Sequence, residues 1–134
     1  MRCVIDTNVL VLGLINSSGK PARILLLINE GLICPVYDFR IINEYKEVLK
    51  RPKFGFSFEL VDFLIENLFA YGESVVALPL DKEFEDPFDK AFYEVSISAK
   101  VDFLITGNKK HFPEEKWIVT PDEFLKKFEK FSFI

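Results

Sequence analysis

The chain has 134 residues, of which 49% are hydrophobic and 15 are Phe, so residues 1–134 can bury a full core as a single domain. Its formal net charge of −4 argues against a general basic coat for nucleic acid. No apolar run is long enough to span a membrane, and the N-terminal layout is not that of a signal peptide. We therefore expect a cytoplasmic protein with no membrane partner.

Short apolar runs alternate with longer helical patterns along the chain. We expect strands at 2–5, 32–35, 74–78, 102–106 and 117–120, and helices at 8–16, 21–31, 39–51, 58–71, 89–99 and from 121 onward. Asp38 and Ser57 are the expected N-caps of two of these helices. The alternation predicts an α/β fold with three layers, α/β/α, around a central, mainly parallel sheet of about five strands. We expect the apolar tail 128–134 to pack on the domain or on a second subunit.

Two cysteines, Cys3 and Cys34, lie inside short apolar segments that resemble strands. They are expected to be reduced core residues. The sequence has no CxxC pair and no Cys/His ligand set, so a structural zinc site is not expected.

Acidic and amide side chains follow several of the predicted strands. Asp6 ends the first strand, Asp86 and Asp89 lie between the third strand and the next helix, and Gly107-Asn108 ends the fourth strand. Ligands of open parallel sheets bind beyond the carboxyl ends of the strands. We therefore expect these positions to share one edge of the sheet.

Glu44 joins this set from the helix that follows the second predicted strand. At about 100° per residue, the apolar side chains of that helix form one stripe. The stripe consists of Ile41, Ile42, Tyr45, Val48 and Leu49. Glu44 falls at its border, where it can lean toward a cleft, whereas Glu47 points nearly opposite and is expected to face solvent.

Each acid also has an ordinary structural interpretation when it is taken alone. Asp6 can cap the following helix, Glu44 can be an exposed helix acid, and Asp86 and Asp89 can be turn and cap residues. Turn chemistry does not require such acids to converge on one edge, so their joint placement carries the evidence. Carboxylates that converge must raise one another's pKa or share a cation. Oxygen ligands suit Mg²⁺ or Mn²⁺, and such a site supports hydrolysis of a phosphodiester.

The ordered motifs of the chain resemble those of PIN domains, the nuclease fold of VapC-type toxins. The motifs are V-I-D-T-N-V-L at the start, I-I-N-E-Y-K-E-V-L-K-R-P-K-F, D-P-F-D-K-A-F-Y-E, A-K-V-D-F-L-I-T-G-N-K-K-H-F-P and I-V-T-P-D-E-F-L. The resemblance covers nearly the whole chain. It is closest to the PIN subfamily of toxin components of toxin–antitoxin systems.

The resemblance implies an Mg²⁺- or Mn²⁺-dependent ribonuclease that leaves 5′-phosphate and 3′-hydroxyl ends. Asp6, Glu44 and Asp89 match the three core acids of the family and would be both the catalytic and the metal-binding residues. Where the family often has a fourth acid, this chain has Asn108, and Asp86 is a further candidate to supply the missing charge.

The remaining expected roles lie around this centre. Asn8 and Thr106 would orient ligands or water. The side chains expected to meet the RNA backbone are Lys109, Lys110, Arg51 and Lys53. His111 is not required as a general base, because water activated by a metal does not need one.

Two further matters stay open in the sequence. With Asn108 in place of an acid, the domain could instead be a degenerate module that binds RNA or protein without cleaving. Apolar helical patterns at 22–28 and 60–69 suggest a homodimer, and the resemblance implies an antitoxin partner. The RNA target is not indicated by any residue pattern.

Overall fold

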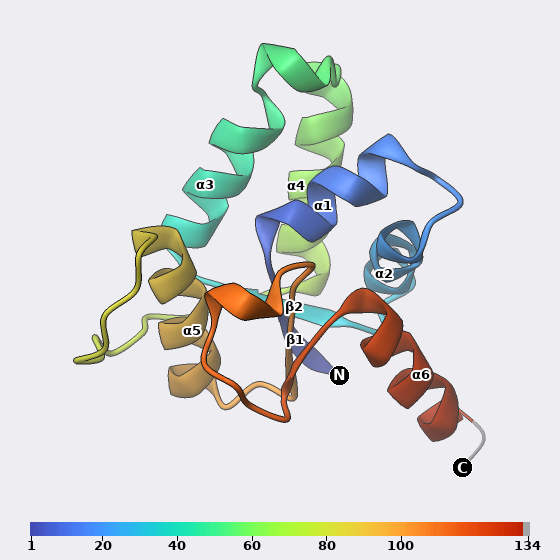
Figure 1. Ribbon diagram of the computed structural model, residues 1–134. Coiled ribbons are helices and arrows are strands. Elements are labelled where there is room, and N and C mark those ends of the chain that lie inside the picture. Colours follow the sequence, from blue (N-terminus) through green and yellow to red (C-terminus); the bar gives the residue numbers. More distant parts are fainter. Residues whose placement is uncertain (133–134) are drawn as a thin grey trace.

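The computed structural model describes residues 1–132, and the side chains of residues 1–130. Its centre is a sheet of five parallel strands surrounded by six α-helices within that range (Figure 1). The strands are β1 (Arg2–Ile5), β2 (Cys34–Tyr37), β3 (Glu73–Ser74), β4 (Phe103–Ile105) and β5 (Ile118–Val119). The helices are α1 (Thr7–Ile15), α2 (Lys20–Asn29), α3 (Phe39–Leu49), α4 (Phe58–Tyr71), α5 (Pro87–Ala99) and α6 (Pro121–Ser132).

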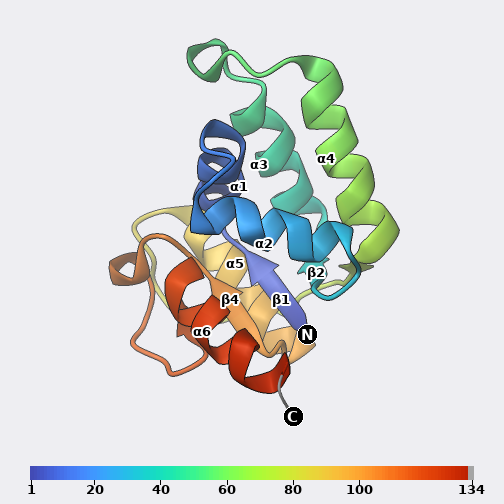
Figure 2. The ribbon, with the colours of Figure 1, turned by 90° about the vertical axis from the view of Figure 1, so that its right-hand side faces the viewer.

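Helices cover both faces of the sheet, which confirms the predicted three-layer α/β/α fold. Helix α5 packs on β1, β2 and β4 from one side, and α6 packs on β4 and β5 from the other. Figures 1 and 2 show α2 beside α6 on that second face, and the pair α3 and α4 extending beyond the sheet. The carboxyl end of β1 therefore opens into the space where α1, α3 and α5 begin.

The strand order β3-β2-β1-β4-β5 makes β1 the central strand. The chain adds β2 and β3 on one side of β1 and then returns to add β4 and β5 on the other. The connections therefore leave the sheet in opposite directions at β1 and β4, and a crevice forms between the carboxyl ends of such a strand pair. Ile5 pairs with Ile105, so the residues that follow them, Asp6 and Thr106, lie side by side at this crevice.

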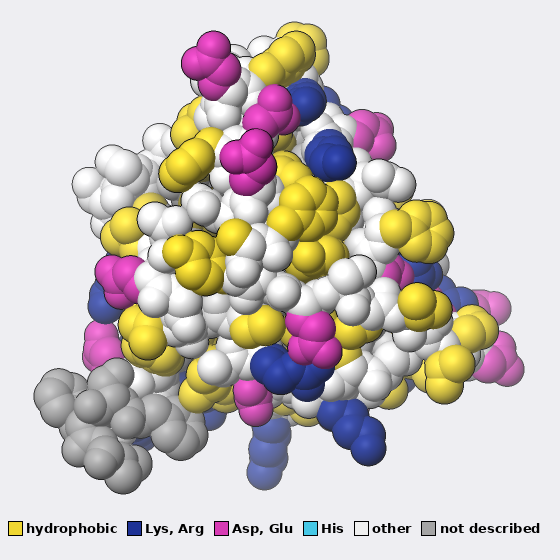
Figure 3. Space-filling model, turned by 180° about the vertical axis from the view of Figure 1, so that it is seen from behind, with side chains coloured by type: hydrophobic (Ala, Val, Ile, Leu, Met, Phe, Trp, Pro, Cys, Tyr) yellow, Lys and Arg dark blue, Asp and Glu magenta, His cyan; other side chains and the backbone are white. Residues whose placement is uncertain are grey.

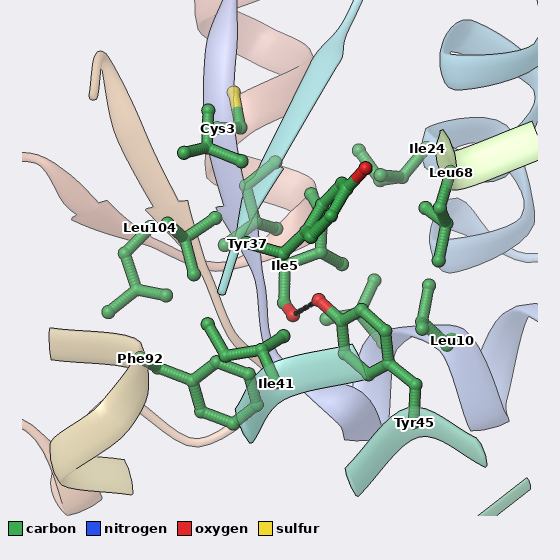
Figure 4. Packing of buried hydrophobic residues seen from close by; sticks show 14 of the residues in the cluster. Cys3, Ile5, Leu10, Ile24, Tyr37, Ile41, Tyr45, Leu68, Phe92 and Leu104 are labelled. Atoms are coloured by element: carbon green, nitrogen blue, oxygen red, sulfur yellow. Dashed lines mark hydrogen bonds between the residues drawn. The ribbon is translucent and has the colours of Figure 1, made fainter. Parts of the chain in front are cut away.

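The core lies between the sheet and the helices, and one of its side chains reaches the sheet backbone. Tyr45 of α3 is completely buried, and its hydroxyl donates a hydrogen bond to the carbonyl of Ile5, the last residue of β1 (Figure 4). Its ring stacks on Phe92 of α5, with 6.4 Å between ring centroids. Tyr45 thus ties together β1, α3 and α5, which are three elements that end or begin at the crevice.

The second and third strands differ most from the prediction, whereas β4 and β5 are each one residue shorter at both ends than predicted. The second strand was expected at 32–35 and lies at Cys34–Tyr37, because the N–H groups of Leu32 and Ile33 bond back to the carbonyl of Leu27 in α2. These residues close the helix instead of joining the sheet.

The third strand is also shorter than expected. Only Glu73 and Ser74 pair with β2, because β2 ends at Tyr37 and the chain then turns into α3. The segment that follows is held by α5 instead: Leu78 N donates to Ser98 Oγ and Leu80 N donates to Glu94 Oε2.

Two helices begin at the predicted N-cap residues, and a third, α5, begins earlier than predicted. Asp38 accepts a hydrogen bond from Ile41 N, and Ser57 accepts one from Leu60 N, which confirms both N-caps. Helix α5 begins at Pro87, two residues earlier than expected, because Asp86 accepts from Phe88 N and Pro87 suits the first helical position. Asp89 consequently lies within the first turn of α5.

The structure also describes both cysteines and the start of the apolar tail. Cys3 is buried, Cys34 is half-buried, and both are free thiols. Phe128 stacks on Phe124, as expected for the apolar tail, whereas residues 133–134 lie outside the described range. In residues 1–132 no single helix is long and apolar enough to cross a membrane, although α1 and α2 together pass that test with a bend of 103°.

Candidate active site

Asp6 is a buried carboxylate at the carboxyl end of the central strand. Its backbone N–H donates to the carbonyl of Ile105 at 2.9 Å, and its Oδ2 accepts from the Thr106 hydroxyl at 2.7 Å. Asp6 occupies the N-cap position of α1, but its side chain makes no cap hydrogen bond and pairs with Thr106. The nearby backbone N–H groups of Thr7 and Asn8 lower the pKa of Asp6 and so favour its charged form. Capping alone therefore does not explain this residue.

Glu44 reaches the same place from α3. Its Oε2 accepts a 2.6 Å hydrogen bond from the Thr7 hydroxyl, so Glu44 is tied to the residue that follows Asp6. Glu47 lies on the exposed side of the helix, where it pairs with Arg51 at 3.6 Å. The predicted orientation of this helix is confirmed.

Asp89 enters from the first turn of α5, and it is buried. Its Oδ2 lies 3.5 Å from His111 Nδ1. Asp86 precedes it as the exposed N-cap of the same helix. The two acids therefore approach the site from the same helix start, one from inside and one from the rim.

One hollow of about 360 Å³ collects these groups. It is lined by Asp6, Thr7, Asn8, Val11, Leu12, Glu44, Val48, Phe54, Asp86, Asp89 and His111. A second hollow of about 380 Å³ shares Asp86, Asp89 and His111 with the first and adds Lys110. The acids predicted from four separate positions of the sequence thus lie along one recess.

The carboxylates act on one another electrostatically. The pKa of Glu44 rises from 4.5 to about 7 in total: burial raises it most, the hydrogen bond from Thr7 lowers it, and the charges of Asp6, Asp86 and Asp89 add to the rise. Burial raises the pKa of Asp89 from 3.8 to about 6, with the charges of Asp6 and Asp86 adding to the rise and His111 opposing it. Burial also raises the pKa of Asp6, against the hydrogen bond from Thr106. The site therefore favours a positive charge among these groups.

The donor set fits Mg²⁺ or Mn²⁺ by its chemistry, because carboxylate oxygens are the ligands that these ions prefer. The pKa values of Glu44 and Asp89 are raised first by burial and then by neighbouring acids, and a cation among them would offset both effects. In residues 1–132, however, no group of three or more His, Cys, Asp or Glu side chains is arranged to hold an ion.

Asn8 and Asn108 both lie at the crevice and contact its loops. Asn8 Oδ1 accepts from Gly107 N at 3.2 Å, which fastens the start of α1 to the end of β4. Asn108 N donates to Thr106 Oγ1, which in turn donates to Asp6. The Asn108 side-chain nitrogen lies 3.0 Å from His111 Nε2. Asn108 is thus part of the site's framework at the position where an acid was to be expected.

The four predicted RNA-contacting cations occupy different surroundings. Lys110 lines the second hollow, beside Asp89. Lys53 lies over the ring of Phe54, which lines the first hollow. Lys109 pairs with Glu123 at 3.1 Å, and Arg51 pairs with Glu47. Lys110 and Lys53 are therefore the two that lie next to the recess.

Some side chains at the site were not singled out from the sequence. Thr7 lay outside the helix predicted at 8–16, and its position between Asp6 and Asn8 is the signal that would have drawn attention to it. Tyr45 was identified only as part of an apolar stripe, because its contact with Ile5 depends on how α3 docks on β1. His111 was considered only as a general base that the reaction does not require, and no sequence signal indicated its proximity to Asp89.

Comparison with known proteins assigns the class of this chain. Residues 2–110 match the family described as PIN domain, so the chain belongs to that family. PIN domains are generally nucleases, which supports a hydrolase at this coarse level.

A curated relative matches along nearly the full length. The chain is 30% identical over 146 aligned residues to Uncharacterized protein MJ1680 of Methanocaldococcus jannaschii, and the alignment covers 98% of this chain and 94% of that protein. No solved structure matches the chain significantly.

Proposed function

We propose that this PIN domain is a cytoplasmic, Mg²⁺- or Mn²⁺-dependent endoribonuclease and the toxin of a toxin–antitoxin pair. The observation that carries the nuclease proposal is the meeting of Asp6, Glu44 and Asp89 in one recess at the carboxyl ends of β1 and β4. They come from three elements, and each has a raised pKa. A structural role for each acid alone does not account for this convergence.

The residues of the chain would divide the work of the site. Asp6, Glu44 and Asp89 would hold the ion, and their side chains would have to turn toward it from their present positions. Thr106 orients Asp6 and Thr7 orients Glu44 through the hydrogen bonds already described. When bound, the ion would supply charge neutralisation at the scissile phosphate and activation of a water molecule.

The two adjoining hollows suggest a path for the RNA strand. Lys110, which lines the second hollow together with Asp86 and Asp89, would meet a backbone phosphate there. On the other side, Phe54 lines the first hollow and stacks on Phe56, with Lys53 over its ring. An aromatic ring with an adjacent cation suits an unpaired base and its phosphate. Single-stranded RNA is therefore the favoured form of the substrate.

An RNA cleavage assay with defined ions tests the proposal. The wild-type chain is expected to cleave single-stranded RNA with Mn²⁺ or Mg²⁺ and to stop when EDTA is added. Asp6→Asn should abolish cleavage, and Glu47→Gln should leave it unchanged because Glu47 lies on the exposed side of α3. Equal cleavage by wild type and Asp6→Asn would show that the acids do not perform the reaction.

A second candidate function is a PIN-like module that binds RNA or protein without cleaving. The observation that favours it is Asn108, whose side chain is engaged with His111 where an acid would supply charge. Cleavage discriminates the two functions. RNA binding that is insensitive to both EDTA and Asp6→Asn, with no cleavage, would favour the module.

The apolar surface of the helices supports association with a second copy. A groove of about 250 Å³ between α1, α2 and α4 is lined largely by apolar side chains, among them Leu26 and Phe63, which are both more than half exposed. Figure 3 shows further apolar side chains gathered in the middle of the opposite face from that in Figure 1. Homodimerisation and antitoxin binding remain proposals, and sedimentation velocity of the isolated chain tests the first of them.

A further inference from the structure

Two buried carboxylates and a partly exposed arginine form a charged network that does not line the recess and has no part in the proposed reaction. Asp38 and Glu94 are each only 4% exposed by their side chains, and Arg40 lies between them. Arg40 Nε donates to Asp38 Oδ2 at 2.8 Å, and Arg40 Nη1 donates to Glu94 Oε1 at 2.8 Å. Buried charges persist only where they are paired in this way, so the network has a fixed geometry.

The network joins the two helices that carry the acids. Arg40 belongs to α3 and lies four residues before Glu44, one turn away on the same side of the helix. Glu94 belongs to α5, the helix whose first turn carries Asp89. The ion pair between Arg40 and Glu94 therefore links the two helices that carry Glu44 and Asp89.

Each end of this link is itself anchored. Asp38 accepts from Ile41 N with its other oxygen, so it both caps α3 and holds Arg40. The second oxygen of Glu94 accepts from Leu80 N, in the segment that leads from β3 toward Asp86. One arginine thus connects the start of α3, the middle of α5 and the chain that approaches Asp86.

We propose that Arg40 is a positioning residue that, through Asp38 and Glu94, fixes α3 against α5 and so sets the helix positions from which Glu44 and Asp89 can turn toward one cation. This inference rests on the proposed function. Outer side chains that orient metal ligands change metal affinity by about 10–100-fold when they are replaced. Arg40 bonds to Asp38 and Glu94 and not to the acids themselves, so its loss is expected to weaken Mn²⁺ binding by about tenfold, the low end of that range.

The chain offers a matched control at the other end of the sheet. Arg2 has nearly the same side-chain exposure as Arg40, 37% against 35%. It also joins three elements, since its Nε donates to Glu73 and its Nη1 donates to the carbonyl of Ala99 at the end of α5. Arg2 begins β1, however, whereas Asp6 follows its end. Replacing Arg2 tests loss of a partly exposed arginine bridge between elements without disturbing the acids.

The experiment measures Mn²⁺ affinity from the electron paramagnetic resonance signal of the free ion, together with thermal unfolding of each variant. The proteins are wild type, Arg40→Met, Arg2→Met and Asp6→Asn, with Arg40→Met/Glu94→Gln in case Arg40→Met leaves Glu94 too strongly unpaired to fold. Arg40→Lys keeps the positive charge and should recover part of the affinity. The expected result is loss of Mn²⁺ affinity in both Arg40→Met proteins and none in Arg2→Met, at a temperature where all are folded.

The possible failures are distinguishable. If Asp6→Asn weakens Mn²⁺ binding but the Arg40 variants bind as wild type does, the role of Arg40 is overturned while the proposed function stands. If Arg2→Met loses as much affinity as Arg40→Met, the effect is a general loss of stability, and the role of Arg40 is overturned. If the wild-type chain binds no Mn²⁺, the proposed function and this inference both fail.

Discussion

Replacing Glu44 by glutamine should stabilise the metal-free protein at alkaline pH while removing a proposed metal ligand. The pKa of this carboxyl rises from 4.5 to about 7 on folding, chiefly through burial and then through the neighbouring acids. The folded state therefore holds the Glu44 proton more tightly than the unfolded chain does. Ionising Glu44 costs stability, and this cost grows as the pH rises from about 4.5 to about 7 and is then complete.

The size of the effect follows from that rise. At about 1.36 kcal/mol per pKa unit, a change from 4.5 to about 7 corresponds to about 3.4 kcal/mol. Glu44 is only half-buried, so screening by solvent reduces this to about 1.5 kcal/mol. A gain of that size raises the unfolding temperature of a chain of this length by about 5 °C. Glutamine keeps an oxygen that can accept from Thr7, so the variant loses the charge and little else.

The assay is thermal unfolding in EDTA at pH 5 and pH 8. Glu44→Gln should unfold at a higher temperature than wild type at pH 8 and at nearly the same temperature at pH 5. Glu47→Gln is the control, and it should differ little from wild type at either pH because Glu47 is exposed. A destabilised Glu44→Gln protein at pH 8, or an equal gain at both pH values, would refute the electrostatic reasoning.

Three further predictions concern neighbouring side chains. Tyr45→Phe leaves the buried Ile5 carbonyl without its donor and should lower the free energy of unfolding by about 1–3 kcal/mol in urea titrations; no loss would contradict the tie between α3 and β1. Asn108→Asp adds a charge at the crevice and should tighten Mn²⁺ binding by about tenfold in calorimetry, whereas unchanged binding would remove Asn108 from the metal site. Lys110→Ala should raise KM for RNA and lower the number of counterions released on RNA binding by about one, as measured from the salt dependence of binding. Lys109→Ala should have a smaller effect, because Lys109 is paired with Glu123, and equal effects of the two variants would contradict this ranking.

Local sequence signals were sufficient for most of the fold. Strands followed from apolar runs, and helix starts followed from side chains that cap locally, such as Asp38 and Ser57. The errors arose where a distant partner decides the outcome. The strand expected at 74–78 is apolar by composition, but β2 has already ended at Tyr37 and cannot pair with all of it. Val76, in the middle of the predicted strand, is exposed, which shows that an apolar segment does not form a strand without a neighbouring strand to pair with.

The acids of the site could be predicted because topology alone brings strand ends to one edge. Asp6 follows β1, and Asp89 begins the helix that packs on β1, so their positions depend on strand order and little else. The groups that hold these acids could not be predicted in the same way. Thr7 contacts Glu44 across 37 residues, and Arg40 contacts Glu94 across 54, and both contacts depend on how whole helices dock. Sequence patterns identify the clustered acids better than the side chains that hold them in place.

The most direct test of the account is anomalous diffraction from a crystal soaked in Mn²⁺. We predict a peak of anomalous density between the carboxylates of Asp6, Glu44 and Asp89, and no such peak in a crystal of Asp6→Asn. An Mn²⁺ peak elsewhere, or none in the wild-type recess at a concentration that supports RNA cleavage, would contradict the central claim that these three acids gather to hold a metal ion.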